Sequence, residues 1–195
     1  MQTNFLKAIL NTDQTVFSFK ELLLKFQTDE TNNLKSKLNY YVKNGYLRHV
    51  RRGLYVKRAT YNHLELATKI LTPSYVSFET VLCSAGVIFQ YYSNIFVASY
   101  QSRNIMCDGQ TYTFRTMKPI ILTNATGIEI LKDYSIASPE RAFLDIIYHS
   151  KHYHFDNMEP LDWDKIYKIL PIYGNNKSMQ KRVNNYAESL QKTME

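Results

Sequence analysis

Positive charge is concentrated in one short segment, residues 46–58, which reads Tyr-Leu-Arg-His-Val-Arg-Arg-Gly-Leu-Tyr-Val-Lys-Arg. Apolar residues recur on both sides of an Arg-Arg-Gly break, a pattern typical of a hairpin, and Gly53 permits the tight reversal. The cationic side chains of this segment are Arg48, Arg51, Arg52, Lys57 and Arg58. Guanidinium and ammonium groups bind phosphate groups, so the chemistry that this ribbon offers is the binding of a polyanion.

The segment before the hairpin is predicted to be a helix that begins at Thr31 or Asn32 and runs to Lys43, where Asn44-Gly45 is a fitting stop. At about 100° per residue, one face is apolar and must pack on the first two helices. That face consists of Leu34, Leu38, Tyr41 and Val42. The opposite side carries Asn32, Asn33, Ser36, Tyr40 and Lys43, with Lys35 and Lys37 flanking. Asn can pair with adenine in the major groove, and lysines can hold phosphates.

The elements that position these side chains form a recognisable order. A short helix over residues 5–10 is followed by a helix that begins after Ser18, with Ser18 and Glu21 forming a capping box. The helix over 31–43 and the hairpin complete the segment. This order predicts a winged helix-turn-helix domain in residues 1–60, with the hairpin as the wing and the third helix in the major groove.

The net charge follows the same boundary. The chain carries a formal net charge of +7, and residues 1–60 hold 11 Lys/Arg against 4 Asp/Glu, whereas residues 61–195 hold 13 of each. A segregated basic field raises the local concentration of a polyanion and speeds its capture. A solubilising surface or a winged helix used for protein contacts are alternatives, but the combined pattern favours double-stranded DNA.

The remaining chain predicts an α+β fold, with a connecting helix or linker over residues 61–74 and a larger mixed domain over residues 75–195. Ser77 is the expected N-cap of a helix that ends near Gly86. Asp108-Gly109, between alternating runs, is a strong hairpin signal. Ser138-Pro139-Glu140 has the composition of a helix start. Further strands are expected over 94–100, 119–122 and 128–131, and further helices over 163–170 and 179–190.

Several of these motifs, in this order, resemble AbiEi-type abortive-infection antitoxins, the antitoxin partners of type IV toxin–antitoxin systems. The motifs lie at residues 51–55, 75–82, 86–88, 114–115 and 136–145. Arg51 to Tyr55 match the wing of that family, and Ser138 to Asp145 match its Ser-Pro-Glu helix.

The resemblance implies a role in phage defence and autorepression through the winged helix, bound at inverted repeats in the operon's own promoter. It also implies that the second domain counteracts a nucleotidyltransferase-like toxin, generally without a stable complex. The segment after about residue 150 carries no motif of that family.

Catalytic and metal chemistry is not expected. His149, His152 and His154 are more typical of a solvated turn than of a metal site, and Glu140 and Asp145, five residues apart, do not face one another on a helix. No glycine-rich phosphate cradle is present, so no cofactor is expected. The rival hypotheses are a nuclease or transferase with its site in residues 75–195, RNA binding through the aromatic residues, and an adaptor that contacts the toxin directly.

The two cysteines, Cys83 and Cys107, lie far apart without the spacing of a metal or redox motif, which is typical of reduced thiols in the cytosol. The first residues lack the pattern of a signal peptide, and no apolar run is long enough to span a bilayer. We therefore expect a cytoplasmic location and no membrane partner.

Overall fold

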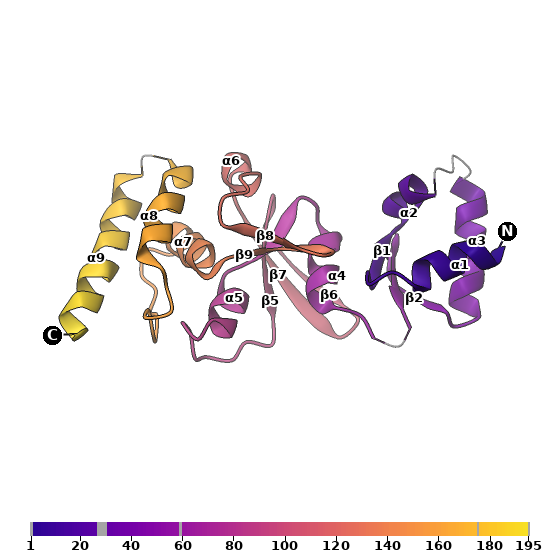
Figure 1. Cartoon of the computed structure of the whole chain (residues 1–195), viewed down its shortest axis with the longest axis horizontal. Helices are drawn as coiled ribbons and strands as arrows, with labels where there is room; N and C mark the ends of the chain where they lie inside the picture. Colours follow the sequence, from indigo (N-terminus) through magenta and orange to yellow (C-terminus); the bar gives the residue numbers. More distant parts are fainter. Residues whose placement is uncertain (1, 27–30, 59, 175, 195) are drawn as a thin grey trace.

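The computed structural model describes residues 2–26, 31–58, 60–174 and 176–194, and the side chains of residues 5–26, 31–58, 60–174 and 176–190. Within these residues the chain forms a mixed α+β structure with two separate β-sheets, as expected (Figure 1). A three-stranded sheet belongs to the N-terminal module, residues 2–58, and a six-stranded sheet belongs to the second module, residues 60–194. No helix among the described residues combines the length and the apolar character needed to cross a bilayer.

The described residues of the N-terminal module form three helices and three short strands. They are α1 (Gln2–Leu10), β1 (Val16–Ser18), α2 (Phe19–Lys25), α3 (Thr31–Lys43), β2 (Leu47–Arg51) and β3 (Leu54–Lys57). The antiparallel sheet has the order β1-β3-β2. Ser18 Oγ accepts from Glu21 N at 3.1 Å and the Glu21 carboxylate accepts from Ser18 N, so the predicted capping box is confirmed.

The three-stranded sheet has an apolar face on each side, because successive side chains of a strand point in opposite directions. Phe17, Leu47 and Tyr55 belong to a core with the three helices, which also contains the predicted α3 face. Val16, Leu54 and Val56 are buried on the other side, in the core of the second module. The sheet therefore lies between the helices and the rest of the molecule, with α3 on the far side (Figure 1).

The second module surrounds a mixed sheet with the order β6-β7-β5-β4-β9-β8. Its strands are β4 (Ser74–Val76), β5 (Ile95–Ser99), β6 (Arg103–Cys107), β7 (Gln110–Thr116), β8 (Ile128–Leu131) and β9 (Tyr134–Ala137). Its helices are α4 (His63–Ile70), α5 (Glu79–Ser84), α6 (Pro119–Leu122), α7 (Pro139–His149), α8 (Trp163–Ile169), the 3-10 helix η1 (Leu170–Tyr173) and α9 (Lys177–Met194). The short strand β4 pairs antiparallel with β5 and parallel with β9, so it joins the two halves of the sheet.

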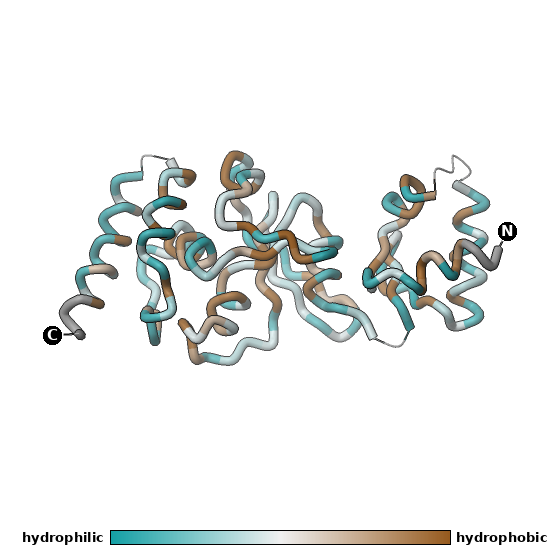
Figure 2. The backbone as a smooth tube through the Cα atoms, in the orientation of Figure 1, coloured by the Kyte–Doolittle hydropathy of each residue, from teal (hydrophilic) through white to brown (hydrophobic). Residues whose placement is uncertain are grey.

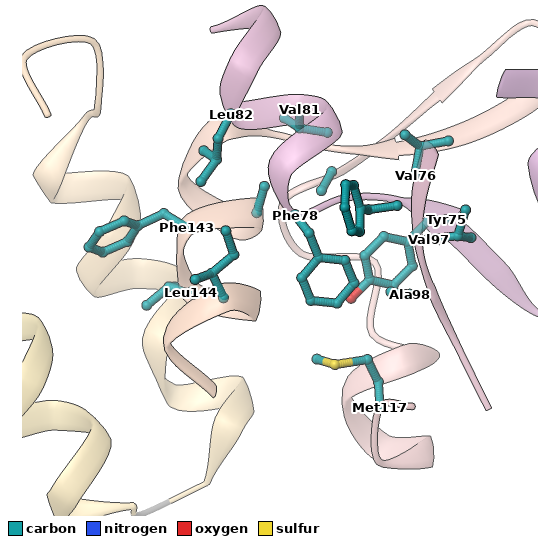
Figure 3. Close-up of a cluster of buried hydrophobic side chains, with 14 of the residues drawn as sticks. Tyr75, Val76, Phe78, Val81, Leu82, Val97, Ala98, Met117, Phe143 and Leu144 are labelled. Atoms are coloured by element: carbon teal, nitrogen blue, oxygen red, sulfur yellow. The ribbon is translucent and has the colours of Figure 1, made fainter. Parts of the chain in front are cut away.

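Helix α7 is central to the second core. Its residues 140–147 are all buried, and it contacts α5, α8, α9 and β9. Figure 3 shows Phe143 and Leu144 of α7 in the same cluster as Leu82 of α5 and Val97 of β5. Ser138 Oγ accepts from Arg141 N at 3.3 Å, and Pro139 occupies the first turn, so the predicted helix start is confirmed.

Two local predictions in this module are wrong. Residues 119–122, predicted to be a strand, form the short helix α6, in which Pro119 opens the helix and Ile121 and Leu122 are buried. A short apolar run has the same pattern in a buried helix as in a buried strand, so periodicity did not distinguish them. Ser77 does not cap α5: Phe78 occupies that position, and the Ser77 hydroxyl donates to Asp145 at 2.7 Å instead.

The connection between the modules is a packed helix. Helix α4 contacts β1 of the first sheet and β4, β5 and β9 of the second. The carboxylate of Glu65 accepts from Thr15 N and Val16 N, each at 2.9 Å, and Lys69 Nζ donates to Val16 O at 2.8 Å. Lys69 Nζ also lies 3.0 Å from Glu21 Oε2. These polar contacts join α4 directly to strand β1 and helix α2.

Candidate nucleic-acid interface

The polar face of α3 is open to solvent. Six of the seven predicted α3 side chains are exposed: Asn32, Asn33, Lys35, Ser36, Tyr40 and Lys43. The opposite face is buried, with Leu34, Leu38 and Tyr41 between 0% and 3% exposed. Along α3, hydrophilic and hydrophobic residues alternate with the helical period (Figure 2). The helix thus presents one continuous polar surface away from the second module.

Two further side chains of α3 define the extent of this polar surface. Lys37 is half-buried at its edge, and its ammonium lies 5.9 Å from the centroid of the Phe5 ring, a distance typical of a cation–π contact. Asn39 is exposed and lies three residues after Ser36 and four before Lys43, so it belongs to the same face. Asn39 was not among the residues predicted from the sequence, although its spacing along the helix indicates the same face.

The tip of the β2–β3 hairpin presents Arg51 and Arg52, which are both exposed. Gly53 has φ of +75°, in the left-handed region that favours glycine, and its carbonyl accepts from Phe19 N at 2.8 Å. The following residue, Leu54, is buried. The two guanidinium groups therefore extend from a turn that is anchored on the first residue of α2 and on the core.

The other three cationic side chains of residues 46–58 form hydrogen bonds or ion pairs within the chain. Arg48 forms an ion pair with Asp108 and lies 5.6 Å from the centroid of the Tyr61 ring. The Lys57 ammonium donates to the carbonyls of Leu10, at 3.1 Å, and of Thr12. Arg58 donates to the carbonyl of Gly45 at 3.3 Å. Lys57 and Arg58 thus connect segments of the N-terminal module, and Arg48 joins it to the second module. Arg51 and Arg52 form the outward cationic tip.

The hairpin also contacts the turn between β6 and β7. This turn has the predicted Asp-Gly form, with positive φ at Asp108 (50°) and Gly109 (79°). Asp108 accepts from the Tyr61 hydroxyl at 2.6 Å, and Cys107 Sγ donates to Val50 O at 3.4 Å. The hydrogen bond from Tyr61 and the positive charge of Arg48 hold the pKa of Asp108 below its ordinary value. One face of the hairpin is thus fixed to the second module.

The strongest candidates for chemistry in the second module are closed to solvent. Arg141 and Asp145 are 0% exposed, with Arg141 Nε 3.4 Å from Asp145 Oδ1. Asp145 also accepts from the hydroxyls of Tyr173 (2.6 Å), Ser77 (2.7 Å) and Tyr75 (3.1 Å). Burial raises the pKa of Asp145, and the guanidinium and the hydroxyl donors oppose that shift. This network joins α7 to β4 and to the end of η1, which is a structural role.

The Arg141 guanidinium also donates to two backbone carbonyls, those of Thr126 and Ile121, each at 2.8 Å. Gly127 lies against the same side chain, because a Cβ built there would be 3.0 Å from Arg141 Cβ. Arg141 therefore ties the loop before β8 and the helix α6 to α7.

A second ion pair joins strand β7 of the sheet to helix α5. Arg115 and the buried Glu79 approach at 2.8 Å through two oxygen–nitrogen pairs, and the guanidinium lies between the rings of Phe78 (4.8 Å) and Phe96 (4.6 Å). Like Arg141, Arg115 belongs to a motif that carries the family resemblance. In both cases the motif residue holds together segments that are distant in the sequence.

The histidines of residues 149–154 do not converge. His154 Nε2 lies 3.8 Å from Asp156 Oδ1, whereas His149 Nε2 lies 3.2 Å from the sulfur of Met117 and its ring packs against Phe78. Within the described ranges, no group of three His, Cys, Asp or Glu side chains is arranged to hold a metal ion.

Comparison with known proteins does not assign this chain to a family. No protein-family model matches the chain, and no curated protein matches it.

Proposed function

We propose that this protein is a DNA-binding antitoxin of a type IV toxin–antitoxin system, which represses its own operon through an N-terminal winged helix-turn-helix. The observation that carries the DNA-binding part is the coincidence of three features in one module: all of the excess positive charge, the exposed polar face of α3 and the exposed tip of the β2–β3 hairpin.

The order of elements supports the winged helix. This motif needs a helix, a short strand, two helices and a hairpin, in the order of α1, β1, α2, α3 and β2–β3. The second strand of the hairpin, β3, pairs with β1. In the proposed complex α3 enters the major groove, where Asn32, Asn39 and Ser36 face base edges. Lys35 and Lys43 contact the phosphates beside it.

The hairpin tip is the proposed second contact. Arg51 and Arg52 lie along the phosphate backbone or enter a minor groove, and the anchored turn limits the conformational entropy that they lose on binding. Because Arg48, Lys57 and Arg58 already have partners within the chain, we assign them a supporting part in this interface.

The antitoxin part of the proposal rests on the resemblance of the motifs to the AbiEi family. The second module has no excess charge, and its motif residues Arg141 and Asp145 are enclosed in its core. We propose that it counteracts a nucleotidyltransferase-like toxin without forming a stable complex. The enclosure of these two side chains disfavours the rival hypothesis of an enzyme that uses them.

The test of DNA binding uses the full chain and a duplex that contains the region upstream of its own gene. Arg51→Ala/Arg52→Ala should weaken binding and lower the slope of log K against log salt, by up to about 0.9 for each phosphate that is no longer neutralised. Lys118→Ala/Lys168→Ala removes the same charge from exposed positions of the second module and serves as the control. An unchanged slope in the hairpin variant would exclude the wing from the interface.

The test of the antitoxin role is co-expression with a nucleotidyltransferase-like protein encoded beside the gene. Restored growth without co-purification supports the proposal. Stable co-purification would favour the adaptor hypothesis, and failure to restore growth would refute the antitoxin role.

A further inference from the structure

A second cationic site lies at the opposite end of the molecule from α3, where the segment after α7 meets α9 (Figure 1). A pocket of about 380 Å³ opens there. Its lining includes Lys151, His152, Ser178, Lys181, Arg182 and Tyr186. Three of these side chains are lysine or arginine, and none of the described residues that line the pocket is an Asp or Glu. Since residues 61–195 are electrically balanced overall, this is a local concentration of positive charge.

Arg182 is held in place by the fold. Its Nη1 donates to Ser178 Oγ at 2.9 Å, and its Nη2 donates to the carbonyl of Ile147, at the end of α7, at 3.0 Å. Its Nε is buried and lacks a hydrogen-bond partner among the described residues. A contact with the end of α7 explains why the guanidinium is fixed. It does not explain why Lys151 and Lys181, from two different segments, lie at the same pocket.

The remaining wall is also rigid. The Tyr186 hydroxyl donates to Tyr153 O at 2.5 Å, and its ring lies edge-on to Phe143 (5.8 Å) and Phe155 (5.2 Å). Lys151 and Lys181 are exposed, so their ammonium groups can move toward a ligand. Along α9 the chain is mostly hydrophilic, as Figure 2 shows. The residues that line the pocket are mainly charged and polar.

We propose that this pocket binds a terminal phosphate group, as carried by a mononucleotide or by the 5′ end of an oligonucleotide. A phosphate monoester carries up to two negative charges and three strong acceptor oxygens, which match a fixed guanidinium and two mobile ammonium groups. The volume lies at the lower end of the range for small-ligand sites, roughly 300–1,000 Å³. A single cluster of three cations suits a terminal phosphate better than the repeated phosphates of a duplex.

The experiment is titration calorimetry on the full chain with five probes: inorganic phosphate, adenosine monophosphate, adenosine, and a short single strand with a 5′-phosphate end or with a 5′-hydroxyl end. The two phosphate-bearing small molecules should bind, and adenosine should not. Preference for the phosphorylated strand over adenosine monophosphate would identify a nucleic-acid end as the source of the phosphate, and the reverse would identify a free nucleotide.

Lys151→Ala/Lys181→Ala should lower the affinity for adenosine monophosphate by about tenfold or more, since the variant lacks two charge-assisted hydrogen-bond donors. Lys118→Ala/Lys168→Ala removes the same charge elsewhere and should not change it. Thermal unfolding of both variants verifies that they fold.

Equal binding of adenosine and its monophosphate, no binding of phosphate-bearing probes, or an unaffected Lys151→Ala/Lys181→Ala variant would overturn the proposal. Arg51→Ala/Arg52→Ala should leave nucleotide binding unchanged, so this site and the proposed operator interface can fail independently.

Discussion

Substitution of Arg141 by Met tests whether the enclosed ion pair of α7 is structural. The side chain has 0% exposure and donates to Asp145, Tyr75 and two carbonyls, so the variant leaves Asp145 in the core without its cation. Removing one partner of a buried ion pair typically costs about 3–5 kcal/mol. That is a large part of the total stability of a domain, about 5–15 kcal/mol. Urea unfolding followed by circular dichroism measures the loss.

The pH dependence of this loss adds a second measurement. Burial already raises the pKa of Asp145, and without the guanidinium the same desolvation should raise it further. The folded variant then holds a proton at pH values where the unfolded chain, with an ordinary Asp pKa of about 3.9, has lost it. Its stability should therefore fall as pH rises from the unfolded to the folded pKa, by about 1.4 kcal/mol per pH unit.

Two further variants distinguish charge from geometry. Arg141→Lys keeps the positive charge but lacks the planar fork that reaches two carbonyls, so an intermediate loss of about 1–3 kcal/mol is expected. Arg103→Met removes an exposed arginine from the edge strand β6 and should change stability by no more than about 0.5 kcal/mol. A loss below about 1 kcal/mol in Arg141→Met, independent of pH, would refute the structural interpretation of the pair.

Three other predictions follow from the structure. Asn39→Ala should weaken binding to the proposed operator by about 1–3 kcal/mol in a fluorescence-anisotropy titration and leave the salt slope unchanged; equal losses on a scrambled duplex would contradict base contact. Asp108→Asn should remove a stabilisation of less than about 1 kcal/mol. Because the pKa of Asp108 is lower in the folded chain, that stabilisation is present above the unfolded pKa and is lost as pH falls through the folded pKa. If the melting temperatures of the Asp108→Asn variant and the native chain changed equally with falling pH, this prediction would be wrong. Burial raises the pKa of both thiols, Cys83 and Cys107, so alkylation at neutral pH should be slower in the folded chain than in urea, and equal rates would show that the thiols are open.

Features set by neighbouring residues were predictable from the sequence. The capping box of Ser18 and Glu21, the apolar face of α3 and the Asp108-Gly109 turn are each determined within a few residues, and the structure confirms all three. The binding of DNA through this helix stays a prediction, since a fold positions side chains without naming their ligand.

Features set by distant residues were not predictable in this way. Strands β1, β4 and β9 are only three or four residues long and are defined by their partners in the sheets. Ser77 has the composition of a helix cap, but a carboxylate 68 residues away takes its hydroxyl. The role of Asp145 likewise depends on side chains from three separate segments, which no local pattern reveals.

The contact of α4 with strand β1 has a consequence for how this chain can be divided. Glu65 and Lys69 occupy the hydrogen-bonding groups along the open edge of a sheet, and Val16, Leu54 and Val56 lie beneath the second module. A fragment cut at residue 60 would expose that edge together with an apolar surface, which favours aggregation. Domain shuffling or engineered fusion would therefore have to transfer α4 with the first sheet, so the N-terminal module cannot be moved to another protein by itself.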